Sequence, residues 1–379
     1  MISQNIYFDH NATTRLDENV LQAMLPFFTE HYQNPGSSHL AGLTVNESLD
    51  HAYWQVADLI GSRPDEVVFT SGATESINLA VRGISNGERN HLITLSAEHK
   101  AVLDTIKDHT GKNNSACSIL PVQDDGLVDP ELLEEAITDK TLLVSIMLVN
   151  NETGTIQDIK RISELVHAKG AFLLCDATQA VGKIPVNVQE LGIDMMAFSA
   201  HKFYGPKGVG ALYISRSVKK YLEPQITGGG QQKNRRSGTL NVPGIIGMAK
   251  ACEIAKENMD RNTAYVGILR DDLESRLLKI EGTAVNGSVE HRIFNTSNMI
   301  FKNVFSELLI MALQHISVSS GSACSSVTTE PSHVLKGLGL SDEDALCSIR
   351  FSLGKDNTKE EIDVVVRRIS ELVAQFREG

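Results

Sequence analysis

Residues 171–179 read AFLLCDATQ and residues 194–202 read DMMAFSAHK, and these two stretches decide the fold class. Each is a short apolar run that ends in polar residues. Such a run is typical of a strand buried on both faces of a parallel sheet, followed by a loop at the sheet edge. The two stretches therefore predict neighbouring buried strands whose ends carry chemically active side chains.

Similar short β-rich runs lie on both sides of these two stretches and alternate with helical patterns from about residue 60 to about residue 215. Helices are expected over Ala73–Gly83 and Ile159–Lys169. Strands are expected over Glu66–Thr70, His91–Leu95, Thr141–Val149, Ala171–Cys175, Asp194–Ser199 and Gly208–Ile214. This alternation predicts an α/β fold with a mainly parallel sheet covered by helices on both faces.

The alternating pattern of strands and helices stops after about residue 243. A long helical pattern runs over residues 245–257 and resumes over residues 264–280, and shorter α and β segments follow. We interpret this region as a second, smaller α+β domain.

Composition and charge exclude several classes of protein. The 379 residues are 41% hydrophobic and 22% charged, which suits a globular chain of roughly two domains. The net charge of -12 argues against nonspecific binding of nucleic acid. The apolar run Leu142–Val149 is too short to cross a bilayer, and MISQNIYFDH at the start has no secretory pattern. We therefore expect a cytoplasmic protein with no membrane span and no direct nucleic-acid partner.

Cysteine usage points to free thiols in a reducing compartment, because the number of cysteines is odd, their spacing is wide and no pair has the CxxC form. The same spacing argues against a structural zinc site. The cysteines are Cys117, Cys175, Cys252, Cys324 and Cys347.

Polar side chains follow five of the predicted strands. In an open α/β sheet, ligands bind beyond the carboxyl ends of the strands. Ser71–Ser76 forms a turn of small residues at the start of a helix, and such a helix N-terminus is suited to binding phosphate. His99 follows the next strand, Asn150–Gly154 the third, Asp176 the fourth and Lys202 the fifth. We expect these groups to meet at one edge of the sheet.

Together these groups match the needs of pyridoxal phosphate. A lysine forms a Schiff base, a carboxylate pairs with the protonated pyridine nitrogen, and a helix N-terminus holds the phosphate. Each group alone also has a plain structural interpretation, since an aspartate after a strand is often an N-cap and a lysine is usually solvated. One ligand uses all of them, so the combination favours a pyridoxal phosphate site.

Over essentially its whole length the chain resembles the cysteine desulfurases, pyridoxal phosphate enzymes of the class V aminotransferase group. The motifs that carry this resemblance are FDHNATT (8–14), residues 69–76, residues 149–154, SAHKFYGPKG (199–208), GGG (228–230), RSGTLN (236–241), SSGSACS (319–325), residues 331–335 and SIRFSLG (348–354).

The resemblance implies fold type I of the pyridoxal phosphate enzymes, with two domains. Residues 15–255 would form the large cofactor-binding domain around a mainly parallel seven-stranded sheet. Residues 1–14 and 256–379 would form the small domain, which carries the catalytic cysteine loop and the arginine for the substrate carboxylate.

The resemblance also implies a role for each matching residue around the cofactor ring. Lys202 would form the Schiff base and Asp176 would face the pyridine nitrogen. Gln179 would contact the ring hydroxyl. His99 would stack on the ring and take part in proton transfer.

At the phosphate, the resemblance implies contacts from Ala73, Thr74, Ser199 and His201 of one subunit. Thr239 would reach the same phosphate from the other subunit of a homodimer.

The remaining implied roles concern the substrate, L-cysteine. Asn11, Asn151 and Arg350 would bind it, with Asn151 also near the cofactor and Arg350 paired to the carboxylate through two parallel bonds. Cys324, in a loop of small residues, would be the nucleophile, and the length of this loop resembles the group with a flexible catalytic loop. Cys324 is also a candidate transient ligand of an iron–sulfur cluster. The other four cysteines are expected to be unreactive.

The implied reaction converts L-cysteine to L-alanine and leaves a persulfide on Cys324. The sulfur would pass to an acceptor protein, an iron–sulfur scaffold by default, with transfer-RNA thiolation and DNA phosphorothioation as alternatives. A selenocysteine lyase or an aminotransferase is the alternative within the same chemistry, and Cys324 argues against plain transamination. A non-catalytic sulfur carrier or scaffold is the alternative of a different class. This non-catalytic alternative is disfavoured because the chain keeps all four catalytic and binding residues, Lys202, Asp176, His99 and Arg350.

Overall fold

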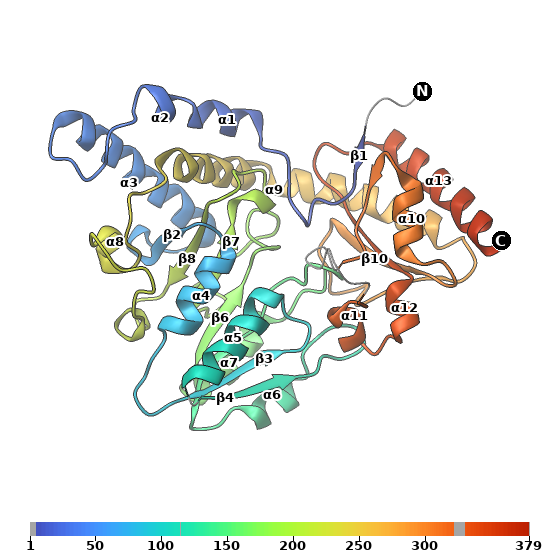
Figure 1. The fold of residues 1–379 in the computed structure, drawn as a ribbon, viewed down its shortest axis with the longest axis horizontal. Helices are drawn as coiled ribbons and strands as arrows, with labels where there is room; N and C mark the ends of the chain where they lie inside the picture. Colours follow the sequence, from blue (N-terminus) through green and yellow to red (C-terminus); the bar gives the residue numbers. More distant parts are fainter. Residues whose placement is uncertain (1–4, 114, 322–329, 379) are drawn as a thin grey trace.

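A seven-stranded sheet forms the centre of the larger part of the molecule (Figure 1). The computed structural model describes residues 5–113, 115–321 and 330–378. Six strands run parallel, and only β8 is antiparallel to its two neighbours, β2 and β7. This confirms the predicted α/β fold. In spatial order the strands are β2 (Val67–Thr70), β8 (Gly210–Ile214), β7 (Met195–Ser199), β6 (Phe172–Asp176), β5 (Thr141–Ser145), β3 (His91–Leu95) and β4 (Ala116–Leu120).

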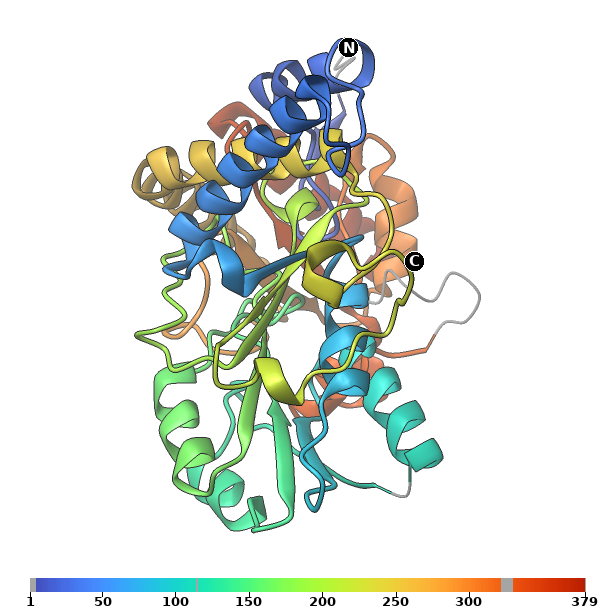
Figure 2. The same ribbon diagram turned by 90° about the vertical axis from the view of Figure 1, so that its left-hand side faces the viewer.

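Helices cover both faces of this sheet because successive apolar residues of each strand point to opposite sides. In β6, Leu174 packs with α4 (Ala73–Gly83) and α5 (Lys100–Asn113). Its neighbours Leu173 and Cys175 pack into the other core. That core is built on the helices α1 (Glu18–Met24), α3 (Leu40–Ile60), α6 (Pro130–Ala136), α7 (Ile159–Ala168) and the first part of α9 (Val242–Leu277). Figure 2 shows the sheet between these two layers.

The smaller part contains a three-stranded antiparallel sheet and a parallel pair of short strands. The three-stranded sheet has the order β12 (Ser348–Ser352), β10 (Thr296–Phe301) and β9 (Thr283–Val285), and the pair is β1 (Ile6–Tyr7) with β11 (Ile316–Ser317). Its helices are α10 (Ser306–Leu313), α11 (His333–Gly337), α12 (Asp342–Leu346) and α13 (Lys359–Glu378). Two further short helices, α2 (Pro26–Thr29) and α8 (Gln231–Asn234), belong to the larger part.

Helix α9 joins the two parts and runs without a break for 36 residues, about 54 Å (Figure 1). The prediction of two separate helices here was wrong, because the polar residues 258–263 continue the helix between the two apolar stretches. The buried residues of α9 up to Ala255 belong to the core of the larger part, and those from Val266 onward belong to the core of the smaller part. The domain boundary after residue 255 remains a prediction.

Two further details differ from the sequence analysis. Strand β4 was missed, since most of its side chains are exposed at the sheet edge and it lacks an apolar run. Strand β5 ends at Ser145 instead of Val149. The N–H groups of Ile146 and Leu148 still donate to β6, but that of Met147 donates to the Glu98 carboxyl group rather than to a neighbouring strand.

The segment of residues 8–14 crosses between the two parts. The N–H of Asn11 donates to Ser352 Oγ at 2.9 Å, and the N–H of Thr14 donates to the carbonyl of His201 at 2.9 Å. This segment therefore lies against both domains, beside the carboxyl ends of β6 and β7. No helix in the described ranges is long and apolar enough to cross a membrane.

Candidate active site

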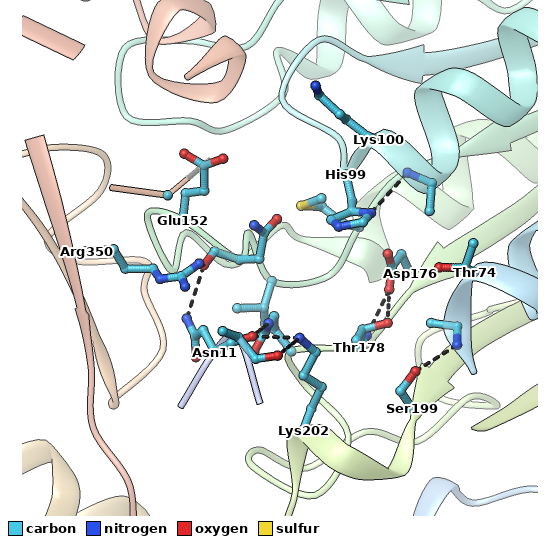
Figure 3. A pocket seen from close by; sticks show the side chains of 18 of the residues that line it. Asn11, Thr74, His99, Lys100, Glu152, Asp176, Thr178, Ser199, Lys202 and Arg350 are labelled. Atoms are coloured by element: carbon cyan, nitrogen blue, oxygen red, sulfur yellow. Dashed lines mark hydrogen bonds between the residues drawn. The ribbon is translucent and has the colours of Figure 1, made fainter. Parts of the chain in front are cut away.

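A cavity of about 480 Å³ opens at the carboxyl ends of the parallel strands, where the sequence predicts the ligand site (Figure 3). Most of the predicted site residues line it. They are Asn11, Ala73, Thr74, His99, Asn151, Asp176, Gln179, Ser199, His201, Lys202 and Arg350. Thr239 is exposed and does not line this cavity. Cys324 lies outside the described residues.

The turn from β2 into α4 forms one end of the cavity. The first N–H of the helix, that of Ala73, donates to Ser199 Oγ at 2.7 Å. Close approach at this turn requires a glycine, since a Cβ atom on Gly210 would lie 2.6 Å from the Cα atom of Gly72. Gly72 offers no side chain to cap the helix, so the dipole of α4 and its early N–H groups are suited to an anion such as phosphate.

His201 lies beside this end of the cavity, and its Nδ1 is 3.0 Å from Thr13 Oγ1. Burial lowers the pKa of His201 to about 4, with the nearby charges of Lys202 and Lys207 adding to the effect. The imidazole is therefore neutral at physiological pH and contributes hydrogen-bonding capacity rather than charge.

Asp176 and His99 form the wall above the sheet (Figure 3). Asp176 is the last residue of β6, is buried, and accepts hydrogen bonds from the N–H and Oγ1 of Thr178 at 2.9 and 2.5 Å. His99 Nδ1 accepts from the N–H of Ala101 at 3.0 Å, which leaves the proton of the neutral ring on Nε2. Burial lowers the pKa of His99, so the neutral form prevails. The wall thus presents one carboxylate and one uncharged imidazole.

Lys202 reaches the middle of the cavity from the short 3-10 turn Ala200–Lys202 that follows β7. Its Nζ donates to the backbone carbonyl groups of Asn11 and Ala12, both at 2.7 Å. An amine is therefore placed between the helix end and the opposite wall.

Arg350 occupies that opposite wall, on β12 of the smaller part (Figure 3). Its Nη2 donates to Asp9 Oδ1 at 2.6 Å, and its Nη1 donates to the carbonyl of Asn151 at 2.9 Å. In the described part of the chain, Arg350 Nε and Asn151 Oδ1 are buried without a hydrogen-bond partner. Buried polar atoms are nearly always paired, so this unused capacity points to a ligand.

A buried acid lies next to this arginine, and the sequence pattern did not predict its place in the site. Glu152 lines the cavity, and its Oε2 accepts from Ser332 Oγ at 2.5 Å. A Cβ atom on Gly321 would lie only 2.4 Å from the same oxygen. Burial raises the pKa of Glu152. Glu152 therefore touches the chain on both sides of residues 322–329. Its place in the motif NNETG, directly after a strand, was the available signal.

Two further buried ionisable groups were also missed. Glu98 accepts from the N–H of Met147 at 2.6 Å through Oε1, and its Oε2 has no partner among the described residues. Burial raises the pKa of Glu98 well above its usual value, which favours the neutral carboxylic acid. Lys183 is buried beside Gln179 and Asn11.

His333 lines the cavity and donates through Nε2 to the carbonyl of Glu98 at 2.9 Å.

The cysteines of the described ranges carry free thiols. Cys175, Cys252 and Cys347 are buried, and Cys117 is exposed on the edge strand β4. Burial raises the pKa of Cys175, Cys252 and Cys347, and partial desolvation raises the pKa of Cys117, which disfavours the reactive thiolate at all four positions.

The donor set fits pyridoxal phosphate. A helix start suited to phosphate, a buried carboxylate at a strand end and a lysine amine between them line one cavity. Arg350 Nε at the far wall has no hydrogen-bond partner among the described residues, so it has donor capacity left for the carboxylate of an amino acid.

Comparison with known proteins agrees with this geometry. The family model described as aminotransferase class-V matches residues 6–365, so the chain belongs to this pyridoxal phosphate-dependent family. Within the family it belongs with the cysteine desulfurases. It is 48% identical to cysteine desulfurase IscS of Pasteurella multocida, over 98% of this chain and 94% of that protein.

Two solved structures show the same fold. The chain resembles a NifS-like protein with a TM-score of 0.92 and 39% identity, over 98% of this chain and all of that one. It also resembles SspA in complex with cysteine, with a TM-score of 0.83 and 32% identity over 93% of this chain and all of that one.

Proposed function

We propose that this cavity removes the sulfur atom of L-cysteine, leaving L-alanine, and that Cys324 receives the sulfur as a persulfide. The observation that carries the proposal is the placement of Lys202 between the anion-binding start of α4 and the partly unpaired Arg350. A phosphate-bearing cofactor and an amino-acid carboxylate then fit at opposite ends, with the amine between them. The likeness to the solved structure of SspA in complex with cysteine supports L-cysteine as the substrate.

The residues proposed to hold pyridoxal phosphate divide by the part of the cofactor they face. Asp176 would keep the ring nitrogen protonated, Gln179 would donate to the ring oxygen, and Lys202 would hold the cofactor through its aldehyde carbon. When bound, the cofactor withdraws electrons from the substrate carbon next to the amino group. The residues proposed for the phosphate are Ala73, Thr74, Ser199 and His201, with Thr239 of a second copy in a homodimer.

The chain's own side chains then handle the substrate. Arg350 binds the carboxylate through its planar guanidinium, helped by Asn151 and Asn11. Lys202 takes the proton from the α-carbon, and the neutral ring of His99 is ready to accept or return a second proton.

Sulfur transfer is proposed to occur at Cys324. Its thiolate attacks the substrate sulfur, so that an S–S bond forms as the C–S bond breaks. The electron pair of the broken bond ends, with a proton, on the carbon that becomes the methyl group of alanine. No external oxidant is required.

The persulfide is proposed to pass to a thiol of an acceptor protein in the cytoplasm, with iron–sulfur cluster assembly as the destination and Cys324 as a transient cluster ligand. Transfer-RNA thiolation, DNA phosphorothioation and selenocysteine cleavage are the alternative outcomes. Mass spectrometry of proteins that receive labelled sulfur from the loaded enzyme distinguishes them.

Two variants test the chemistry. Borohydride reduction of the cofactor-supplemented wild type should attach the cofactor to Lys202, and Lys202→Ala should lose both the adduct and alanine formation. Cys324→Ala should keep the adduct and lose the persulfide. A wild-type protein that stays colourless and gives no adduct at Lys202 would refute the proposal. Alanine formation that persists in Lys202→Ala would also refute it.

A further inference from the structure

Asp9 is the acid that pairs with the arginine proposed to bind the substrate carboxylate. Its Oδ1 atom lies 2.6 Å from Arg350 Nη2, and this is the one ion pair that Arg350 forms in the described ranges. The two side chains are 18% and 3% exposed. Asp9 is not among the described residues that line the cavity, so any influence on a bound molecule must pass through Arg350.

The backbone holds Asp9 in this place. The N–H of His10 donates to the carbonyl of Ser352 at 3.0 Å, and the N–H of Ser352 donates to the carbonyl of Phe8 at 2.8 Å. These two hydrogen bonds lie on either side of Asp9 and fix it against β12, the strand that carries Arg350. The carboxylate is therefore kept beside the guanidinium by main-chain contacts.

Arg350 can bind a second carboxylate without releasing Asp9. A guanidinium has five N–H groups, of which one donates to Asp9 and one to the carbonyl of Asn151. Its Nε is buried without a hydrogen-bond partner in the described part of the chain. A substrate carboxylate would therefore pair with the same cation that Asp9 already neutralises.

The other acid near this arginine does not replace Asp9. Glu152 and Arg350 form neither a hydrogen bond nor an ion pair with each other in the described ranges. Burial raises the pKa of Glu152, which disfavours its charged form. The negative charge next to the guanidinium therefore comes from Asp9.

One positive charge that is shared by two carboxylates binds each of them less strongly than it would bind one alone. Asp9 repels the charge of a second carboxylate, because two unit charges several ångströms apart still interact near a protein surface. Without Asp9, Arg350 would be a buried charge without a counterion, which is costly, and a bound carboxylate would reduce that cost. Both effects mean that Asp9 lowers the affinity for carboxylates.

We propose that Asp9 is a positioning residue that limits how tightly Arg350 holds a carboxylate, so that the product L-alanine can leave. The proposal deepens the proposed function and rests on Arg350 as the group that binds the substrate carboxylate. L-Cysteine and L-alanine carry the same carboxylate, so an arginine without this counterion would retain the product as well as the substrate. Asp9 lowers the affinity for both and thereby favours release.

The test measures the affinity of the cofactor-loaded, full-length chain for L-alanine, from the change in visible absorbance as the amino acid is added. Asp9→Asn keeps the size of the side chain and an oxygen for Arg350, but it removes the charge. We expect its dissociation constant for L-alanine to fall about tenfold, which corresponds to about 1.4 kcal/mol. Added L-alanine should also inhibit the turnover of L-cysteine at a correspondingly lower concentration.

L-Alaninamide separates charge from structure, because it has the amine and methyl group of L-alanine but no carboxylate. Its dissociation constant in Asp9→Asn should stay within about twofold of the wild-type value, since an uncharged group is not repelled by Asp9. Asp9→Glu keeps the charge and should keep the wild-type affinity for L-alanine within about threefold. Asp9→Ser removes the charge and serves if Asp9→Asn does not fold.

Glu274→Gln provides a matched control. The side chain of Glu274 is 12% exposed and pairs with Arg292, whose side chain is 5% exposed, and neither residue lines the cavity. This variant should unfold at a lower temperature than the wild type, as Asp9→Asn should, because each leaves a buried arginine without its counterion. Its affinity for L-alanine should equal that of the wild type.

The proposal is overturned if Asp9→Asn binds L-alanine as the wild type does or more weakly. It is also overturned if L-alaninamide shifts as much as L-alanine, or if Glu274→Gln gains the same affinity. These results leave the proposed function intact as long as the wild type responds to L-alanine and borohydride attaches the cofactor to Lys202. A wild type that shows neither response removes the basis of the proposed function instead.

Discussion

Replacing Arg350 by lysine tests the proposed recognition of the substrate carboxylate. Arg350 is 2% exposed, and its Nη1 and Nη2 atoms donate to the carbonyl of Asn151 and to Asp9. Its planar fork still has a buried Nε without a partner in the described part of the chain. A lysine would offer one compact ammonium group instead. This group cannot donate two parallel hydrogen bonds to a carboxylate while also donating to the Asn151 carbonyl and to Asp9.

The size of the effect follows from the bonds lost. One hydrogen bond to a charged group contributes about 1.5–3 kcal/mol, so losing one of two bonds to the carboxylate should lower kcat/KM roughly 10- to 150-fold. The loss should appear mainly in KM, because the carboxylate is bound before and during the reaction alike. Alanine formation measured over a range of L-cysteine concentrations provides both constants.

Arg292 provides a matched control. Its side chain is 5% exposed, and its Nε has no hydrogen-bond partner among the described residues. It donates two hydrogen bonds to Glu274, at 2.6 and 2.7 Å, but it does not line the cavity. Arg292→Lys should lower stability and leave kcat/KM within about twofold of the wild type. A kcat/KM for Arg350→Lys within the same range would refute the assigned role.

Three other outcomes are expected. Ser199→Ala should weaken cofactor binding about tenfold in a fluorescence titration, because it removes the hydroxyl that is proposed to contact the phosphate and that accepts from the first N–H of α4. Gly354→Ala should destabilise the fold by about 1–3 kcal/mol in urea unfolding, since the new Cβ atom would lie 2.3 Å from the buried His10 ring. The hydrogen bond to Asp194 raises the pKa of His167, so this pair stabilises the fold at low pH and its contribution fades as the pH rises through that pKa. The stability gap between wild type and His167→Gln should therefore be larger at pH 5.5 than at pH 9, by less than about 1 kcal/mol because His167 is half exposed.

The strand ends of the large domain could be predicted from the sequence because each buried strand is a clear run of apolar residues. The end of that run marks the last residue of the strand. Asp176 and Ser199 are the last residues of β6 and β7, and each lines the cavity as expected. The edge strand β4 gave no such signal, since its side chains face solvent.

Residues that act through long-range contacts were out of reach of local patterns. Lys183 lies in a turn whose sequence is compatible with a solvated lysine, and only the fold buries it against Asn11, 172 positions away. The pairing of Glu152 with Ser332 spans 180 positions for the same reason. The continuity of α9 was missed because a polar stretch looks the same in a loop as in an exposed part of a helix.

The crossing of residues 8–14 between the two domains has a consequence for the order of events during synthesis. Asn11 leaves the ribosome early, yet its partner Ser352 is 341 positions further along the chain. At about 5–20 residues per second, the ribosome needs about 17–70 s to supply that partner. The catalytic chamber therefore closes only near the end of translation, and a message cut short before β12 would yield a chain that can bury its large sheet but never complete its active centre.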